Sequence, residues 1–143
     1  MTALDERDAR LKRGDELWKQ LCAGLDSHLH EPVGPNTDWT GHEVYAHFAR
    51  WQQQTLDAVR AILAGRQPRN VEGTEEEINN RWRAEDRASD TATVRQQCLD
   101  TRVELRTLMA GLSEEQWSIW GRQSFDDIDG SHYTHHIAAL GKP

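Results

Sequence analysis

The sequence predicts an all-α protein, an antiparallel four-helix bundle with one additional short helix. Three observations lead to this fold class. Apolar residues recur three and four positions apart with almost no strand-like alternation, several helix starts carry capping residues, and the connections are short. No internal repeat or linker divides the 143 residues. We therefore expect residues 1–143 to form a single domain, large enough for a core without disulfides.

The first helix is expected from about residue 4 to about residue 30. The segment EPVGPN follows it, and proline cannot continue a helix. One apolar stripe runs along the predicted helix, and we expect it to face the core: Leu11, Trp18, Leu21, Leu25 and Leu29.

The second helix has the best-marked start, in the segment DWTGHEV. Thr40 can cap the free backbone N–H groups while Glu43 reaches back to the cap, which is a capping box. Trp39 and Val44 occupy the positions of a hydrophobic staple around it. The helix should end near Gly65. Its expected inward row is Val44, Phe48, Trp51, Thr55, Val59 and Ile62.

Shorter segments complete the prediction. Thr74 and Glu77 form a second capping box that opens a short helix, EEEINNRWRAED. A longer helix starts at about Thr91, SEEQW adds one or two turns, GRQSFDDIDG is a loop, and a last helix carries three histidines. The apolar side of the longer helix is expected to hold Val94, Cys98, Leu105, Leu108 and Leu112.

Composition and charge narrow the function classes. The net charge is −7 and no block of Lys and Arg stands out, which disfavours nucleic-acid binding. No run of ~20 apolar residues could span a bilayer, and the N-terminus lacks the apolar region of a secretory signal. We therefore expect a cytoplasmic protein without a membrane partner. Cys22 and Cys98 form no CxxC motif and are expected to be small, reduced apolar residues on helices.

The C-terminal segment DGSHYTHHIAAL holds three histidines. His132 and His136 are four residues apart, so on a helix they lie on one side, about 5.4 Å apart along the axis. Ile128 and Leu140 continue this row, which we expect to face the bundle. His135 is rotated by about 100° and is expected to neighbour the pair rather than act with it.

A third histidine on the inward side comes from the second helix. His47 lies three residues after Val44 and four before Trp51, whereas His42 lies near the cap and is expected to be exposed. Three neutral imidazoles suit zinc, nickel, iron or copper and leave one position open, as in catalytic sites. The alternative is three ordinary core or rim histidines, because a pair spaced by four occurs by chance in many helices.

Four segments in this order, DWTGHEVYAHFARW, EEEINNRW, LMAGLSEEQW and HYTHH, resemble the DinB-like superfamily of four-helix bundles. This superfamily includes thiol-dependent maleylpyruvate isomerases, bacillithiol and mycothiol S-transferases, and ClbS/DfsB proteins. The resemblance implies that His47, His132 and His136 hold a divalent metal. The 143 residues contain no separate C-terminal substrate domain like that of the longer isomerases, so isomerase activity is not expected.

Other residues are candidates for substrate contacts. Trp51 would wall the pocket or be plain core, Asn79 would hydrogen-bond substrate or be a solvated amide, and Tyr133 adjoins the histidines and could donate a proton. Arg81 and Arg83 are better explained by surface salt bridges than by binding an anionic thiol.

The leading hypothesis is a metal-dependent enzyme, with zinc, nickel or iron, that activates a low-molecular-weight thiol for S-transfer to a small-molecule electrophile in detoxification. One alternative is a non-enzymatic stress or ligand-binding protein, and another is a metal-free, ClbS-type protective hydrolase. A homodimer is also expected, because relatives associate through helices and the six tryptophans are more than one bundle needs.

Overall fold

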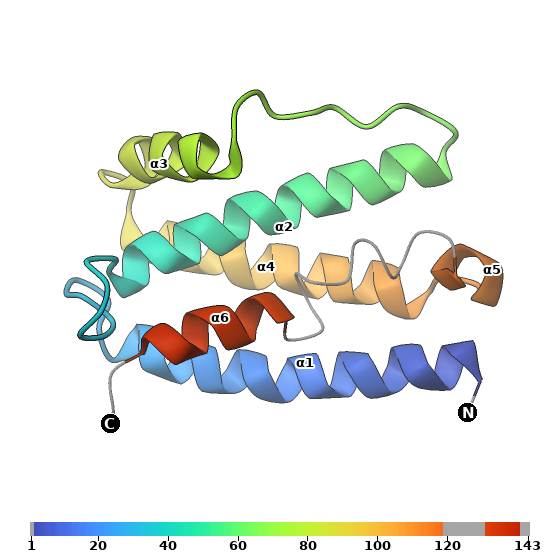
Figure 1. The fold of residues 1–143 in the computed structure, drawn as a ribbon, viewed down its shortest axis with the longest axis horizontal. Coiled ribbons are helices and arrows are strands. Elements are labelled where there is room, and N and C mark those ends of the chain that lie inside the picture. Colours follow the sequence, from blue (N-terminus) through green and yellow to red (C-terminus); the bar gives the residue numbers. More distant parts are fainter. Residues whose placement is uncertain (1, 119–130, 141–143) are drawn as a thin grey trace.

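The computed structural model describes residues 2–118 and 131–140, and within these ranges the chain forms helices without strands. The helices are α1 (Ala3–Asp26), α2 (Gly41–Leu63), α3 (Glu75–Asp86), α4 (Thr91–Ala110), α5 (Glu114–Gln116) and α6 (Ser131–Ala139). Figure 1 shows α1, α2, α4 and α6 side by side, with α3 lying outside against α2. The predicted all-α class is confirmed. In the described part of the chain, no helix is both long and apolar enough to cross a membrane.

The direction of the helices follows from one long connection. Residues 64–74 lead back along α2 before α3 begins, so α2 and α4 run in the same direction (Figure 1). Helices α1 and α6 run in the opposite direction. The bundle is therefore antiparallel between these two pairs of helices and parallel within each pair.

Helix α1 ends at Asp26, about four residues before the predicted end. The carbonyls of His28 and Leu29 accept hydrogen bonds from the N–H groups of Gly41 and His42, at 2.8 and 3.0 Å. These are free N–H groups of the first turn of α2, so the residues that follow α1 cap α2 instead of extending α1. A Cβ at Gly41 would overlap the Leu25 carbonyl and lie 2.9 Å from the His28 oxygen, so this junction requires glycine.

Helix α2 begins as predicted, with a complete Thr40–Glu43 capping box. Its inward row differs from the prediction. Gln52 and Leu56 are completely buried, whereas Trp51, Thr55 and Ile62 are only half-buried. The reason is that α2 packs against α1, α3 and α4 together, which buries a wider face than one row. Gly65 ends the helix region with a left-handed φ of 72°.

The remaining starts also carry caps. Thr74 accepts from Glu77 N, Asp90 accepts from Thr93 N, and Ser113 forms a capping box with Gln116. Cys22 and Cys98 lie on helices as free thiols, as predicted. Burial raises the pKa of both thiols, so both are protonated at neutral pH.

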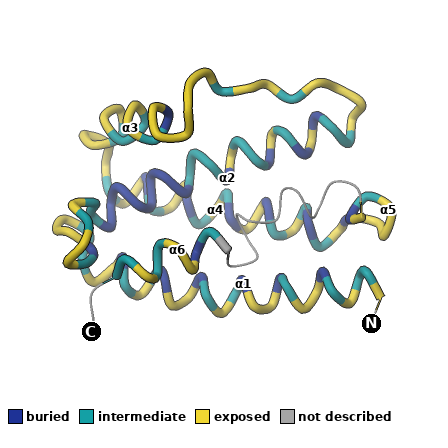
Figure 2. The backbone as a smooth tube through the Cα atoms, in the orientation of Figure 1, coloured by how far each residue is buried: buried dark blue, intermediate teal, exposed yellow. Residues whose placement is uncertain are grey.

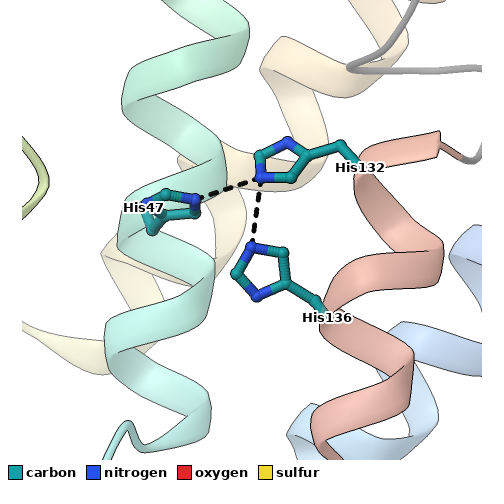
Figure 3. Close-up of side chains that lie close together, drawn as sticks. All are labelled: His47, His132 and His136. Atoms are coloured by element: carbon teal, nitrogen blue, oxygen red, sulfur yellow. Dashed lines mark hydrogen bonds between the residues drawn. The ribbon is translucent and has the colours of Figure 1, made fainter. Parts of the chain in front are cut away.

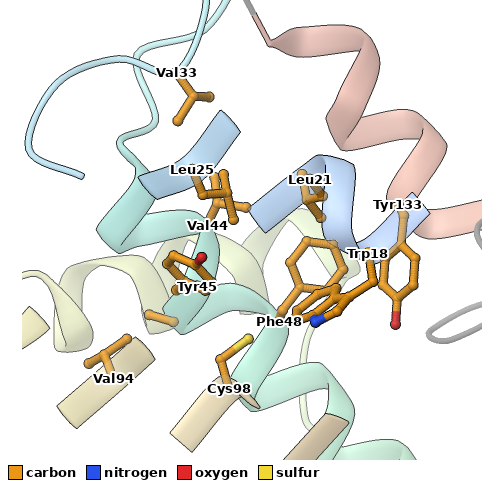
Figure 4. Close-up of a cluster of buried hydrophobic side chains, with 11 residues drawn as sticks. Trp18, Leu21, Leu25, Val33, Val44, Tyr45, Phe48, Val94, Cys98 and Tyr133 are labelled. Atoms are coloured by element: carbon orange, nitrogen blue, oxygen red, sulfur yellow. The ribbon is translucent and has the colours of Figure 1, made fainter. Parts of the chain in front are cut away.

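Figure 2 marks the buried residues along the helices in dark blue. They form two clusters. The site-end cluster, drawn in Figure 4, consists of Trp18, Leu21, Leu25, Val33, Val44, Tyr45, Ala46, Phe48, Val94, Cys98 and Tyr133. The far-end cluster consists of Leu11, Leu56, Val59, Leu105, Met109, Leu112 and Trp117. Two buried polar residues, Gln52 and Arg102, lie between them in sequence on α2 and α4.

Candidate metal centre

Three imidazoles from two helices meet beside the site-end cluster. His47 comes from α2, and His132 and His136 come from successive turns of α6 (Figure 3). The His132 Nε2 atom lies 3.2 Å from His47 Nε2 and 3.1 Å from His136 Nε2. One ligand atom from each residue lies within 4.8 Å of the others. The structure thus brings together the three histidines that the sequence singled out.

Helix α6 presents the histidines on one face and packs on α1 with another. The core-facing row is Tyr133, Ile137 and Leu140, spaced four and three residues apart, whereas His132 and His136 face α2. The predicted row was therefore too simple, because Leu140 belongs to the face against α1; Ile128 lies outside the described residues. A Cβ at Gly24 would lie 2.5 Å from Leu140 Cδ1, so a glycine on α1 lets α6 approach closely.

Burial keeps two of these imidazoles, those of His47 and His136, neutral. Desolvation is the main cause that lowers the pKa of His47 well below its usual value, and His136, His132 and His135 lower it further. Burial, followed by repulsion from His132 and His135, lowers the pKa of His136 to about 3. Metal ligation requires neutral imidazole. At neutral pH, His47 and His136 are therefore already in the ligand form.

The donor set fits a divalent transition metal better than a hydrogen-bond network. A neutral imidazole nitrogen carries either one proton or one lone pair. His132 Nε2 therefore cannot satisfy both His47 Nε2 and His136 Nε2, although both are within hydrogen-bond distance. Tetrahedral metal–nitrogen bonds of about 2.0–2.1 Å place neighbouring ligand nitrogens about 3.3–3.4 Å apart. The two separations, 3.2 and 3.1 Å, are slightly shorter than that spacing.

The histidines line a pocket of about 600 Å³ at this end of the bundle, which is within the usual range for small-molecule sites. Apolar walls come from Leu25, Val33 and Val44, and polar groups come from Asn36, Thr37, Glu75 and Asn79. Trp39 also lines it and meets the His47 ring edge-on, with ring centroids 5.6 Å apart. The exposed His135 lies at the same pocket and contacts the His136 ring.

The three residues expected to contact substrate lie in different places. Asn79 lines the pocket. Trp51 lies behind it and donates its Nε1–H to Asn79 Oδ1 at 2.7 Å. Tyr133 is completely buried, and its ring packs between Trp18 and Phe48. The structure therefore brings Asn79 to the histidines, with Trp51 as its support, and places Tyr133 in the core.

The sequence did not predict the hydrogen bonds and ion pairs around the N-terminus of α2. His42 is buried, not exposed, because its ring bonds to Thr91 Oγ1 at 2.7 Å and to the Asp86 carbonyl at 2.9 Å. Arg83 stacks on Trp39 at 4.5 Å and pairs with Glu43. The predicted salt-bridge role of Arg83 is thus observed, although it also braces a pocket wall. The sequence contains these acidic and basic residues, but it does not show which of them pair across helices.

A helical bundle with three converging histidines in a pocket defines a candidate metal-binding bundle protein of the DinB-like superfamily. More narrowly, the chain belongs to the mycothiol maleylpyruvate isomerase N-terminal domain family, whose family model matches residues 11–131. This match confirms the resemblance seen in the sequence. No curated protein and no solved structure matches the chain.

Proposed function

We propose that this protein is a divalent-metal-dependent enzyme that catalyses thiol-dependent S-transfer to a small electrophile, in a detoxification role. The observation that carries the proposal is the convergence of three imidazoles in a pocket of small-molecule size. The family name connects the domain with mycothiol, and we take a low-molecular-weight thiol of that kind as co-substrate. Both free cysteines have raised thiol pKa values, so neither supplies a ready thiolate.

The position of each residue in the pocket indicates its role. His47, His132 and His136 would hold zinc, nickel or iron through nitrogen atoms that already face one another. A divalent ion bound there would lower the pKa of a thiol or water and polarise an oxygen. The apolar walls Leu25 and Val44 limit access of water to the buried side of the pocket.

Asn79 would orient the substrate. Its Oδ1 accepts from Trp51 Nε1, which fixes the orientation of the amide and leaves the Nδ2–H₂ group as a donor. Because Asn79 also lines the pocket, this donor suits a substrate with a carbonyl or carboxylate oxygen. Trp51 therefore acts on the substrate through Asn79 rather than by contact.

Elemental analysis tests the metal centre directly. Wild-type protein from metal-supplemented medium should contain about one equivalent of transition metal, and His132→Ala should lose at least ~100-fold in affinity, more than the 10–100-fold typical of removing an outer-shell partner. His135→Ala is the matched control, because His135 lies on the same helix but outside the cluster. Less than about a tenth of an equivalent in the wild type would contradict the proposal.

A thiol-conjugation screen then tests the reaction. The metal-loaded protein should conjugate an electrophile in the presence of a low-molecular-weight thiol, and chelation should abolish the activity. Activity that survives replacement of all three histidines by alanine would favour a metal-free hydrolase. The apolar pocket walls favour a second candidate, ligand sequestration. That function predicts a rise in thermal stability with an apolar ligand and no response to a chelator.

A further inference from the structure

Tyr133 follows His132 directly in the chain, yet its side chain lies in the core. The ring centroid is 5.1 Å from that of Trp18 and 5.5 Å from that of Phe48. Its hydroxyl oxygen accepts a hydrogen bond from Arg102 Nε at 3.2 Å. Tyr133 therefore connects the helix that carries two of the histidines to α4, through a polar contact inside an apolar cluster.

The contact continues across the bundle to α1. Arg102 Nη1 donates to Asp15 Oδ1 at 2.8 Å, and Arg106 pairs with the other carboxylate oxygen at 2.7 Å. Burial alone would raise the pKa of Asp15, but the hydrogen bonds from Arg106 and Arg102 lower it below its usual value. Asp15 is thus anionic at neutral pH and holds Arg102 in place. The hydroxyl of Tyr133 is the point at which α6 joins this buried network.

Loss of the Tyr133 hydroxyl should destabilise this buried network. Arg102 is 6% exposed, and its Nη2 atom is buried without a hydrogen-bond partner in the described part of the chain. Removing the Tyr133 hydroxyl would leave Nε unpaired as well. A buried donor without an acceptor is costly, so the guanidinium favours the arrangement of α6 that supplies the hydroxyl.

Helix α6 needs such a constraint because it is short. It has nine residues, and isolated helices shorter than ~12–15 residues are marginal in water. Its apolar contacts through Ile137 and Leu140 are non-directional. A rotation by one residue, ~100°, would carry His132 and His136 away from His47. A directional hydrogen bond at Tyr133 disfavours that rotation.

We propose that Tyr133 is a positioning residue for the candidate metal centre: through Arg102 and Asp15 it sets the rotation of α6, and with it the spacing of the three imidazoles. The part of this inference that concerns metal affinity rests on the proposed function. The part that concerns α6 does not, and it can be measured in the metal-free protein.

Tyr133→Phe tests the role, because it removes the hydroxyl and keeps the ring. Tyr45→Phe is the matched control: Tyr45 is equally buried in the site-end cluster, but its hydroxyl donates to Asp26 on α1 at 2.7 Å. Both variants should lower the melting temperature to a similar extent. Only Tyr133→Phe should accelerate amide hydrogen exchange selectively in α6, by about tenfold, as expected for a local opening.

The metal-binding readout is Co²⁺ affinity, measured by competition with a chelator, together with the Co²⁺ absorption spectrum. Tyr133→Phe should weaken Co²⁺ binding by about tenfold, the lower end of the effect of outer-shell partners, and alter the spectrum. Tyr45→Phe should leave both unchanged. Arg102→Lys should reproduce the Tyr133→Phe result, because an ammonium group lacks the fork that reaches both partners.

Unchanged exchange in α6, or equal changes in both tyrosine variants, would overturn the positioning role whatever the metal results. If wild-type protein binds no Co²⁺, Zn²⁺, Ni²⁺ or Fe²⁺, the proposed function fails and exchange in α6 alone decides the inference. If wild type binds Co²⁺ and Tyr133→Phe binds it equally well with the same spectrum, Tyr133 is a structural residue only and the proposal is wrong.

Discussion

The two ends of the bundle are built differently. Among the described residues, the far-end cluster is almost entirely aliphatic, with Trp117 as its aromatic member. The site-end cluster contains Trp18, Tyr45, Phe48 and Tyr133, and both of its tyrosine hydroxyls take part in hydrogen bonds. Three of the six buried polar side chains in the described part of the chain also lie near this end: His42, Glu43 and His47.

The two ends of the bundle are therefore stabilised by different kinds of contact. A buried polar group destabilises the fold unless it is paired, so the site end depends on specific partners, such as Thr91 for His42 and Arg83 for Glu43. The far end depends mainly on filled volume, together with one buried hydrogen bond from Arg7 Nη1 to the Leu112 carbonyl at 2.6 Å. Stability and site geometry should therefore respond to different substitutions.

The largest effect on stability is expected at the far end, from Leu105→Ala. Leu105 is completely buried, and the substitution leaves a cavity that costs about 2–5 kcal/mol in the free energy of unfolding. Metal affinity should stay within about threefold of wild type, since distant sites act independently. Urea unfolding and Co²⁺ titration measure the two quantities. A parallel loss of affinity would show that the two ends are coupled.

A smaller and pH-dependent effect is expected from Glu43. Burial would raise its pKa, but hydrogen bonds from Arg83 and the Thr40 backbone lower it to about 2, below the usual 4.5. The folded pKa is the lower one, so the stabilisation is fully present above about pH 4.5 and is lost as the pH falls toward about 2. We expect Glu43 to contribute about 2 kcal/mol to the free energy of unfolding. This is less than the full pKa shift implies, because the Arg87 partner is exposed and solvent screens the interaction.

Glu43→Gln isolates this contribution. The variant should be less stable than wild type at pH 7, and the difference between the two should shrink as the pH falls from about 4.5 to about 2. Other carboxylates with lowered pKa values, including Asp15 and Asp26, affect both proteins equally and cancel in the difference. Free energies from urea unfolding at several pH values check this. A difference that does not vary with pH would contradict it.

Local signals in the sequence predicted the features that depend on neighbours along the chain. The Thr40–Glu43 and Ser113–Gln116 boxes formed as expected because each involves residues three positions apart. His47 could be placed on the inward side from its spacing to Val44. The pairing of His132 with His136 followed from helix geometry, and the family resemblance connected them to His47.

Features that depend on contacts between helices could not be predicted in this way. Helix α3 covers one side of α2, so Gln52 and Leu56 became core while Trp51 became the partner of Asn79. His42 is buried because the α3–α4 junction supplies its two partners. Tyr133 faces the core because its ring packs against Trp18 of α1 and Phe48 of α2. None of these partners is close in sequence to the residue it contacts.

The smallest stability effect is expected from Trp51→Phe, on the α3 side of the pocket. The substitution removes the 2.7 Å hydrogen bond to Asn79 and keeps an aromatic ring against Trp82, so the free energy of unfolding should fall by about 1 kcal/mol. Co²⁺ affinity should not change, because neither Trp51 nor Asn79 belongs to the histidine cluster.

A double-mutant cycle with Asn79→Ala, followed by urea unfolding, measures the coupling between Trp51 and Asn79. Trp82→Phe serves as the control for replacing an indole by a smaller ring. A coupling near zero would mean that Trp51 does not hold Asn79 in solution. A loss of Co²⁺ affinity would mean that the pocket wall formed by α3 and the histidine cluster respond as one unit.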